Sequence, residues 1–233
     1  MILKDVKQRI DQCNEEQRKD VLQYVRQYID IHPLEKQLNC SAEIILEAIQ
    51  RAPDITVRGI RGIIAEATFK IEIIDQLTSW TNVCLVGQLP YDFLIKDGDR
   101  QITIQVKLQR KAKQNPLERN GKWVVETQKT RSGNKDGKKT RPYQFGEFDI
   151  LAVSLQPSAN IWNKFMYTIS SWLIPHKENA NFLRTLQPVS KIPDDEWTDN
   201  LETCIDWHFS NITKILSDFP PTPKRQKQNK QIV

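Results

Sequence analysis

Apolar residues recur at the three- and four-residue spacing of amphipathic helices through the first third of the chain. Two such helices are expected within 1–31. Asn14 followed by Gln17 has the form of a capping box that begins the second helix. His32-Pro33 is expected to end it, because the residue before a proline is pushed out of the helical conformation.

Two more helices are expected before the first strand. One begins at Ser41 and ends at Pro53-Asp54, and a longer one covers about 57–77. Glu66 lies beside the apolar stripe of the longer helix. The residues predicted to form that stripe are Ile60, Ile63, Ile64, Ala67, Ile71 and Ile74.

After Trp80 the apolar residues form short runs that are typical of strands. Lys96-Asp97-Gly98-Asp99 is a strong hairpin signal between two of these runs. Residues 162–174 are expected to form a strand pair or a mixed segment. Residues 194–216 are expected to form a closing helix. Strands are expected at 83–86, 91–95, 101–109, 123–127 and 148–155. The pattern predicts an α/β fold with a central mixed β-sheet flanked by helices and an N-terminal helical segment.

The length of 233 residues suits one compact domain with small attachments. We expect an N-terminal helical arm over 1–35, a main domain over 36–218, and a basic disordered tail over 219–233. The arm is interpreted as a substrate-gripping element, a dimer-forming element or a simple packing appendage, and the sequence leaves these three open.

Composition excludes several classes of protein. No apolar run approaches the roughly 18 residues of a membrane span, and the N-terminus lacks the apolar run of a secretory signal, so we expect a cytoplasmic protein. The four cysteines are isolated, which argues against a zinc site and leaves them as ordinary small side chains.

Positive charge is concentrated in one segment. The whole chain carries +5, whereas residues 110–141 contain eleven basic and three acidic residues and so carry +8. A polyanion partner and a solvated loop without a partner both explain this distribution.

The alternating strand 101–109 places chemistry on one face. Its apolar residues point to the core, so Gln105 and Lys107 share the opposite face. The turn at 97–99 folds Asp92 back beside residues 103–105. An ordinary half-exposed hairpin with a polar outer face is the alternative interpretation.

A carboxylate, an amide oxygen and an ammonium group that converge in this way have a chemical use. Asp92 and Gln105 offer oxygen ligands for Mg²⁺, which takes only one or two carboxylates from a protein. Mg²⁺ held there would help to activate water for attack on phosphorus. Lys107 is suited to orient that water or to stabilise charge on the phosphoryl oxygens.

Pro90-Tyr91-Asp92, followed after twelve residues by Gln105-Val106-Lys107, resembles the signature of the PD-(D/E)XK nucleases. The segments Gly62–Glu66 and Tyr143–Val153 resemble the helix and the strand that accompany it. The sequence departs from the family pattern in the tyrosine before Asp92 and in Gln105, which replaces the usual acid.

The resemblance implies a restriction-endonuclease-like fold and a type II restriction enzyme. Metal ligation would fall to Asp92, Gln105, Val106 and Glu66, and catalysis to Asp92, Gln105, Glu66 and the ammonium group of Lys107. The enzyme would be a homodimer that cuts both strands of double-stranded DNA to leave 5′-phosphate ends, and a cognate DNA methyltransferase would be encoded nearby.

The basic segment 109–142 would face DNA, with Lys and Arg on phosphates and amide side chains on base edges. A structure-selective repair or junction nuclease and a non-catalytic nucleic-acid-binding module with a decayed site remain alternatives. The residues expected to contact DNA are Gln109, Arg110, Lys111, Lys113, Arg119, Lys122, Arg131, Lys138, Lys139, Arg141, Tyr143 and Gln144.

Overall fold

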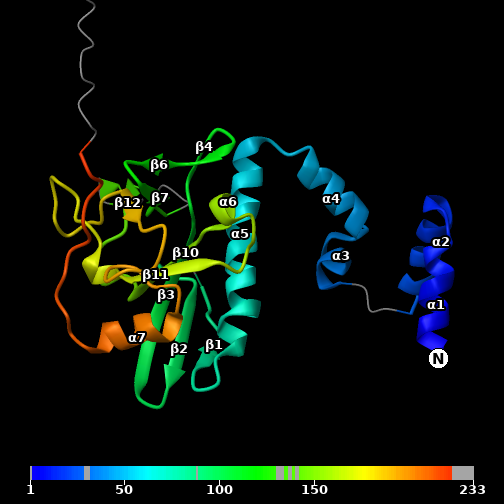
Figure 1. The fold of residues 1–233 in the computed structure, drawn as a ribbon, viewed down its shortest axis with the longest axis horizontal. Helices are drawn as coiled ribbons and strands as arrows, with labels where there is room; N and C mark the ends of the chain where they lie inside the picture. Colours follow the sequence, from blue (N-terminus) through cyan, green and yellow to red (C-terminus); the bar gives the residue numbers. More distant parts are fainter. Residues whose placement is uncertain are drawn as a thin grey trace, which may run out of the picture. The chain divides into compact units, whose positions relative to one another are not determined.

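The computed structural model describes residues 2–28, 32–87, 89–129, 134–135, 138–139 and 142–221, the two pairs 134–135 and 138–139 by their backbone alone. The chain forms two compact units, Met1–Val57 and Arg58–Val233 (Figure 1). Within the described residues, none of the helices combines the length and the apolar composition needed to cross a membrane.

The first unit consists of helices. They are α1 (Ile2–Asp11), α2 (Glu15–Arg26), α3 (Pro33–Leu38) and α4 (Ala42–Gln50). The predicted capping box of α2 is confirmed, since the side chains of Asn14 and Gln17 each accept a bond from the backbone of the other. Pro33, expected only to end a helix, begins the short helix α3, because proline fits the first helical position.

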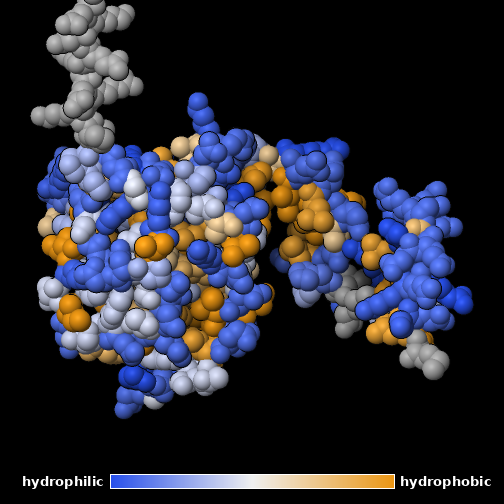
Figure 2. Space-filling view, viewed as in Figure 1, coloured by the Kyte–Doolittle hydropathy of each residue, from blue (hydrophilic) through white to orange (hydrophobic). Residues whose placement is uncertain are grey.

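None of these four helices has a buried residue. Their apolar side chains are exposed, among them Leu3 at 68%, Leu22 at 53% and Ile44 at 60% of their surface. Apolar surface is visible over α4 in Figure 2. The described residues of this unit therefore enclose no core of their own.

The long helix is α5 (Asp54–Glu72), followed by a 3₁₀ turn at Ile74–Gln76. Its predicted apolar stripe is wrong in part: Ile63 and Ile71 are exposed, and the residues that α5 buries are Ala65 and Phe69. The sequence spacing did not indicate that one large aromatic ring would fix which face of the helix turns inward.

A five-stranded mixed sheet forms the centre of the second unit, in the order β1-β2-β3-β10-β11. β3 and β10 are parallel, and the other neighbours are antiparallel. The strands are β1 (Thr81–Val83), β2 (Phe93–Asp97), β3 (Arg100–Leu108), β10 (Ile150–Ser154) and β11 (Phe165–Ile169). The predicted mixed α/β fold and the hairpin between β2 and β3 are confirmed.

The basic segment is more ordered than a polar loop with a single strand. A second sheet has the order β12-β7-β6, and two short hairpins pair β4 with β5 and β8 with β9. These strands are β4 (Lys111–Ala112), β5 (Asn115–Pro116), β6 (Glu118–Arg119), β7 (Lys122–Glu126), β8 (Asn134–Lys135), β9 (Lys138–Lys139) and β12 (Leu186–Val189).

The closing helix is shorter than predicted. The remaining helical elements are α6 (Gln156–Ala159), a 3₁₀ turn at Ser170–Trp172, and α7 (Leu201–Phe209). Asn200 caps α7 by accepting a hydrogen bond from Thr203 N, which fixes its first turn. Trp197, predicted as part of this helix, lies before it and is fully buried.

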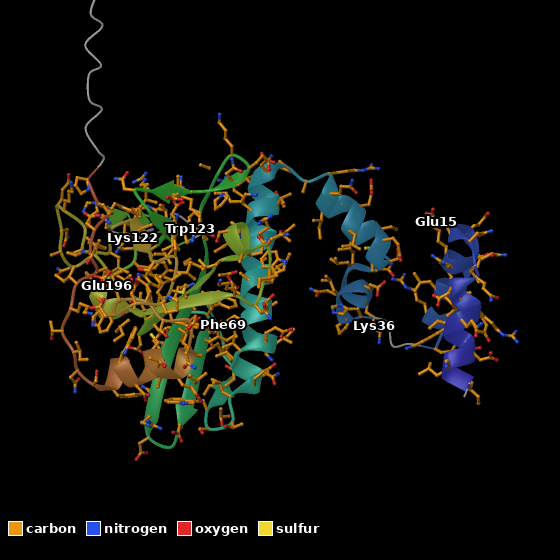
Figure 3. All side chains as sticks on the ribbon, viewed as in Figure 1. Glu15, Lys36, Phe69, Lys122, Trp123 and Glu196 are labelled. Atoms are coloured by element: carbon orange, nitrogen blue, oxygen red, sulfur yellow. The ribbon has the colours of Figure 1, made fainter. Side chains whose placement is uncertain are left out.

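Phe69 attaches α5 to the sheet. Its ring centroid lies 5.3 Å from that of Phe93 and 5.1 Å from that of Phe165, and Figure 3 labels it where α5 meets the strands. Phe93 pairs with Ile104, so the alternate residues of β3 that include Ile104 share the face packed against α5. That face is the predicted core face of β3, and the side chains of Gln105 and Lys107 belong to the other.

Candidate active site

Asp92 lies directly before β2 and is held there by the backbone of β3. Its own N–H donates to the carbonyl of Ile104 over 3.0 Å. Its Oδ2 accepts a hydrogen bond of 2.8 Å from Val106 N and another from Gln105 Nε2. The hairpin register thus brings Asp92 beside residues 104–106, one residue further along β3 than the predicted 103–105.

Gln105 is enclosed, with 2% of its surface exposed. Nε2 also donates to the carbonyl of Val106 over 3.0 Å, and Oε1 accepts from the Tyr143 hydroxyl over 3.0 Å. The alternative interpretation of a half-exposed outer face is therefore wrong at Gln105. Tyr143 covers this position from a segment 38 residues away in sequence, which the strand pattern did not reveal.

Lys107 is directed at the same place. Its Nζ lies 5.2 Å from the centroid of the Tyr143 ring, a cation–π distance. Burial lowers the pKa of Lys107, and the carboxylates of Asp92, Glu66 and Glu126 oppose that shift. Glu126 is a member of this group that sequence analysis missed, because β7 reaches the site only through the second sheet.

Glu66 joins the site from α5. Burial, together with the neighbouring Asp92 carboxylate, raises the pKa of its carboxyl group to about 7, against the opposing effect of Lys107. Burial likewise raises the pKa of Asp92, against the opposing effects of Lys107 and the hydrogen bond from Val106. Helix α5, the β2–β3 hairpin and strand β7 therefore bring the carboxyl groups of Glu66, Asp92 and Glu126 near the ammonium group of Lys107, with the amide of Gln105 bonded to Asp92.

The donor set of this cluster suits a hard cation. Asp92 and Glu66 offer carboxylate oxygens and Val106 a backbone carbonyl, which are the ligand types of Mg²⁺. The described residues hold no group of three or more His, Cys, Asp or Glu that could bind a metal, so water would have to complete the coordination. Gln105 presents its nitrogen to Asp92, and its oxygen would reach a cation there only after the amide turned over.

Two residues expected to contact DNA are buried. Gln109 is 1% exposed and its Oε1 accepts a hydrogen bond from Ser158 N, while Tyr143 is 4% exposed and bonded to Gln105. The prediction that these two side chains contact DNA is therefore wrong, because both lie in the interior of the protein. Alternation put Gln109 on the polar face, but directly after β3 its backbone forms a bridge with Val125 of the second sheet, and its side chain bonds the backbone of Ser158.

Several basic residues of the segment have partners within the protein. Arg110 pairs with Glu126, and Lys122 contacts Glu196 over 3.2 Å; Figure 3 labels Lys122 and Glu196. Arg119 lies over the ring of Phe219, 5.6 Å from its centroid. Part of the +8 charge is therefore engaged internally.

One exposed part of the described segment is the turn between β4 and β5. Lys113 is exposed there with φ +55°, and Lys111 is partly buried. Gln144 is also exposed. Arg131 and Arg141 lie outside the described residues, as do 222–233 of the tail. Lys138 and Lys139 are described only by their backbone in β9.

The raised pKa of Glu66 predicts a dependence of stability on pH. The folded protein holds this proton more tightly than the unfolded chain, whose ordinary value is 4.5. The contribution of the protonated Glu66 to the free energy of unfolding is therefore complete below about pH 4.5 and is lost as pH rises through about 7. We expect the free energy of unfolding, measured by urea denaturation, to fall over this range less steeply in Glu66→Gln than in the wild type.

Glu72→Gln is the matched control, since Glu72 is exposed on the same helix. Its pH profile should follow that of the wild type. Identical profiles for the wild type and Glu66→Gln would contradict the assignment of a buried, protonated carboxyl group to Glu66.

Comparison with known proteins gives little further information. No protein-family model and no curated protein matches the sequence. Among solved structures, the bacterial homing endonuclease I-Ssp6803I is similar with a TM-score of 0.38 and 15% sequence identity, over 65% of this chain and 91% of that one. A similarity of this size assigns the chain to no family.

Proposed function

We propose that this protein is a Mg²⁺-dependent endonuclease that cuts double-stranded DNA at specific sequences, as a type II restriction enzyme does. The observation that carries the proposal is the convergence of Asp92, Gln105, Lys107 and Glu66 at one end of the β2–β3 hairpin. Glu66 comes from helix α5 and the other three residues from the β2–β3 hairpin, and the order and spacing of Asp92, Gln105 and Lys107 carry the resemblance to the PD-(D/E)XK signature.

Each residue has a separate task in this proposal. Asp92, the Val106 carbonyl and Glu66 would hold Mg²⁺, with Gln105 as a further oxygen ligand. The bound ion would supply Lewis-acid chemistry, acidifying water and polarising the phosphoryl oxygens. Lys107 would orient the attacking water or stabilise the developing charge, and cleavage would leave 5′-phosphate and 3′-hydroxyl ends.

The β4–β5 turn supports the choice of DNA as the substrate. It begins four residues after Lys107 and carries Lys111 and Lys113. Lysine side chains beside a cleavage site would neutralise phosphates and make the affinity depend on salt.

A homodimer would fit this substrate, because a two-fold axis matches two antiparallel strands. The helical unit 1–57 is the proposed dimer contact. It contains eight basic and ten acidic residues, so its net charge of −2 does not favour DNA, while its exposed apolar faces favour another protein surface. A DNA methyltransferase of the same specificity, encoded nearby, would protect the host.

Replacing Lys107 tests the catalytic assignment. We expect Lys107→Ala to cut plasmid DNA with Mg²⁺ at least about 100-fold more slowly than the wild type, because charge stabilisation at the phosphorus is lost. Lys96→Ala is the control, since Lys96 is exposed on the neighbouring strand β2. Initial rates from gel electrophoresis give the comparison.

Equal cutting by the wild type and Lys107→Ala, or no cutting by the wild type across many DNA sequences, would refute the proposal. Cutting confined to branched DNA would instead support a junction nuclease. Tight binding that ignores Mg²⁺ and yields no products would support a binding module.

The β4–β5 turn is tested through salt dependence. Lys111→Ala with Lys113→Ala should reduce the slope of log affinity against log salt concentration by about 2, because each phosphate contact contributes about 0.9. Fluorescence anisotropy with duplex DNA and Ca²⁺ in place of Mg²⁺ measures binding without cleavage. Lys4→Ala with Lys7→Ala, on the exposed helix α1, should leave the slope unchanged. An unchanged slope in the Lys111/Lys113 variant would exclude the turn from the interface.

The dimer is tested by sedimentation equilibrium. We expect twice the monomer mass of 27.2 kDa for the wild type. Leu3→Asp, Leu22→Asp and Ile44→Asp together should give a monomer, because charges then oppose burial of the apolar faces. Ile192→Asp, which alters an exposed apolar side chain of the second unit, should stay dimeric. A monomeric wild type, or a dimer in the triple variant, would argue against this contact.

A further inference from the structure

The side-chain amide of Gln105 is surrounded by three groups, two of which only accept hydrogen bonds. Nε2 donates to Asp92 Oδ2 and to the carbonyl of Val106, and Oε1 accepts from the Tyr143 hydroxyl. Gln105 is 2% exposed, so water does not replace a lost partner. The bonding of this amide is therefore complete within the protein.

The partners dictate which way the amide points. The opposite orientation would set Gln105 Oε1 against a carboxylate oxygen and a carbonyl oxygen with no proton between them. Asp92 Oδ2 already accepts from Val106 N over 2.8 Å, which keeps that oxygen in place. A positively charged centre would let three oxygens converge there.

The two oxygens that Nε2 contacts are oxygens that the proposed function gives to Mg²⁺. We propose that Gln105 changes from hydrogen-bond donor to metal ligand by turning its amide through about 180°, and that the Tyr143 hydroxyl accommodates both orientations. This inference rests on the proposed function and adds to it a positioning role for Tyr143 and a conformational step that accompanies metal binding.

Tyr143 is suited to such a role. A tyrosine hydroxyl both donates and accepts, so it bonds Gln105 Oε1 in one orientation and Nε2 in the other. Its ring is held edge-on against Phe148, with centroids 5.3 Å apart and an interplanar angle of 87°. Lys107 and Lys129 lie over it at 5.2 and 5.3 Å. The oxygen stays in place while only its proton changes direction.

Glutamine has an advantage over an acid at this position. A glutamate would place a second carboxylate against Asp92 with no donor between them. The amide instead binds Asp92 and Val106 itself, so the cluster is internally bonded before a cation arrives. The chemical cost is that the cation must replace two hydrogen bonds of Gln105.

The orientation of the amide can be followed directly by NMR. The side-chain ¹⁵N–¹H pair of Gln105 is assigned by its absence in Gln105→Glu and titrated with MgCl₂. We expect this pair to shift in a saturable manner as its protons leave Asp92 and Val106, and the amide pair of the exposed Gln101 to stay unmoved. A Gln105 pair that remains fixed up to the highest concentration of Mg²⁺ would overturn the proposal.

The two-way role of the hydroxyl is tested with Tyr143→Phe. This change removes one hydrogen bond from each orientation, so the Kd for Mg²⁺, measured by calorimetry, should change less than about threefold. If the hydroxyl bonded Gln105 in the metal-free orientation alone, its loss would tighten binding, by about tenfold for a bond worth 1.4 kcal/mol. Such tightening would overturn the two-way role. Tyr167→Phe, a buried tyrosine of β11, is the control.

Gln105→Glu tests the internal bonding by thermal unfolding. Without Mg²⁺ its Tm should be lower than that of the wild type, and Mg²⁺ should raise its Tm by more than it raises that of the wild type. Gln101→Glu, at an exposed position of the same strand, should show neither effect. An unchanged metal-free Tm in Gln105→Glu would contradict the bond between Gln105 and Asp92.

These readouts separate the inference from the proposed function. An amide that responds to Mg²⁺ in a protein that cuts no DNA would uphold the inference and remove the nuclease. Mg²⁺-dependent cutting of DNA with an unmoved Gln105 amide would support the nuclease and overturn the inference.

Discussion

The register of the β2–β3 hairpin determines where every group of the candidate site lies. Phe93 pairs with Ile104, and one residue earlier Asp92 reaches the N–H of Val106 over 2.8 Å. Alternate side chains face opposite sides of a strand, so a slip of one residue would exchange Gln105 for Ile104 on the polar face. The hydrophobic core against α5 and the polar cluster therefore depend on the same strand pairing. The parallel neighbour β10 places β3 in the middle of the sheet.

Burying the charged groups of the candidate site costs solvation free energy. The attraction between their opposite charges does not offset that cost. Burial raises the pKa of Asp92 and of Glu66 and lowers that of Lys107, so each is displaced toward its neutral form although opposite charges lie nearby. Loss of water outweighs the mutual attraction. Shifts of this kind, produced by burial together with specific neighbours, are concentrated at functional sites. A cation and a phosphate would each meet groups of opposite charge that are already stripped of water.

Local pattern predicted the parts of the fold that depend on local chemistry. The capping box at Asn14, the turn at 97–99 and the apolar alternation of β3 follow from neighbouring residues, and the structure contains all three. The buried face of α5 did not follow, because Phe69 packs on strands that lie much later in the chain.

The same limit applies to the candidate site. Asp92, Gln105 and Lys107 came from one hairpin, which parity and turn chemistry describe well. Tyr143 over Gln105 and Glu126 near Lys107 belong to segments whose approach depends on the second sheet. Charge counting had a different weakness. It treated every lysine and arginine of the basic segment as available to a partner, whereas Arg110 and Lys122 pair with carboxylates of the same chain.

The second sheet also joins the basic turn to the site mechanically. Directly after β3, Gln109 bridges to Val125, and Arg110 N donates to Val124 O over 2.8 Å. The chain then forms the β4–β5 turn, and the N–H of Leu117 returns to the carbonyl of Arg110 over 2.7 Å. Both ends of the turn are thus fixed to backbone that is continuous with the strand of Lys107. A phosphate held at this turn would be held at a nearly constant distance from Lys107, so a contact that contributes affinity would also position the bond to be cut.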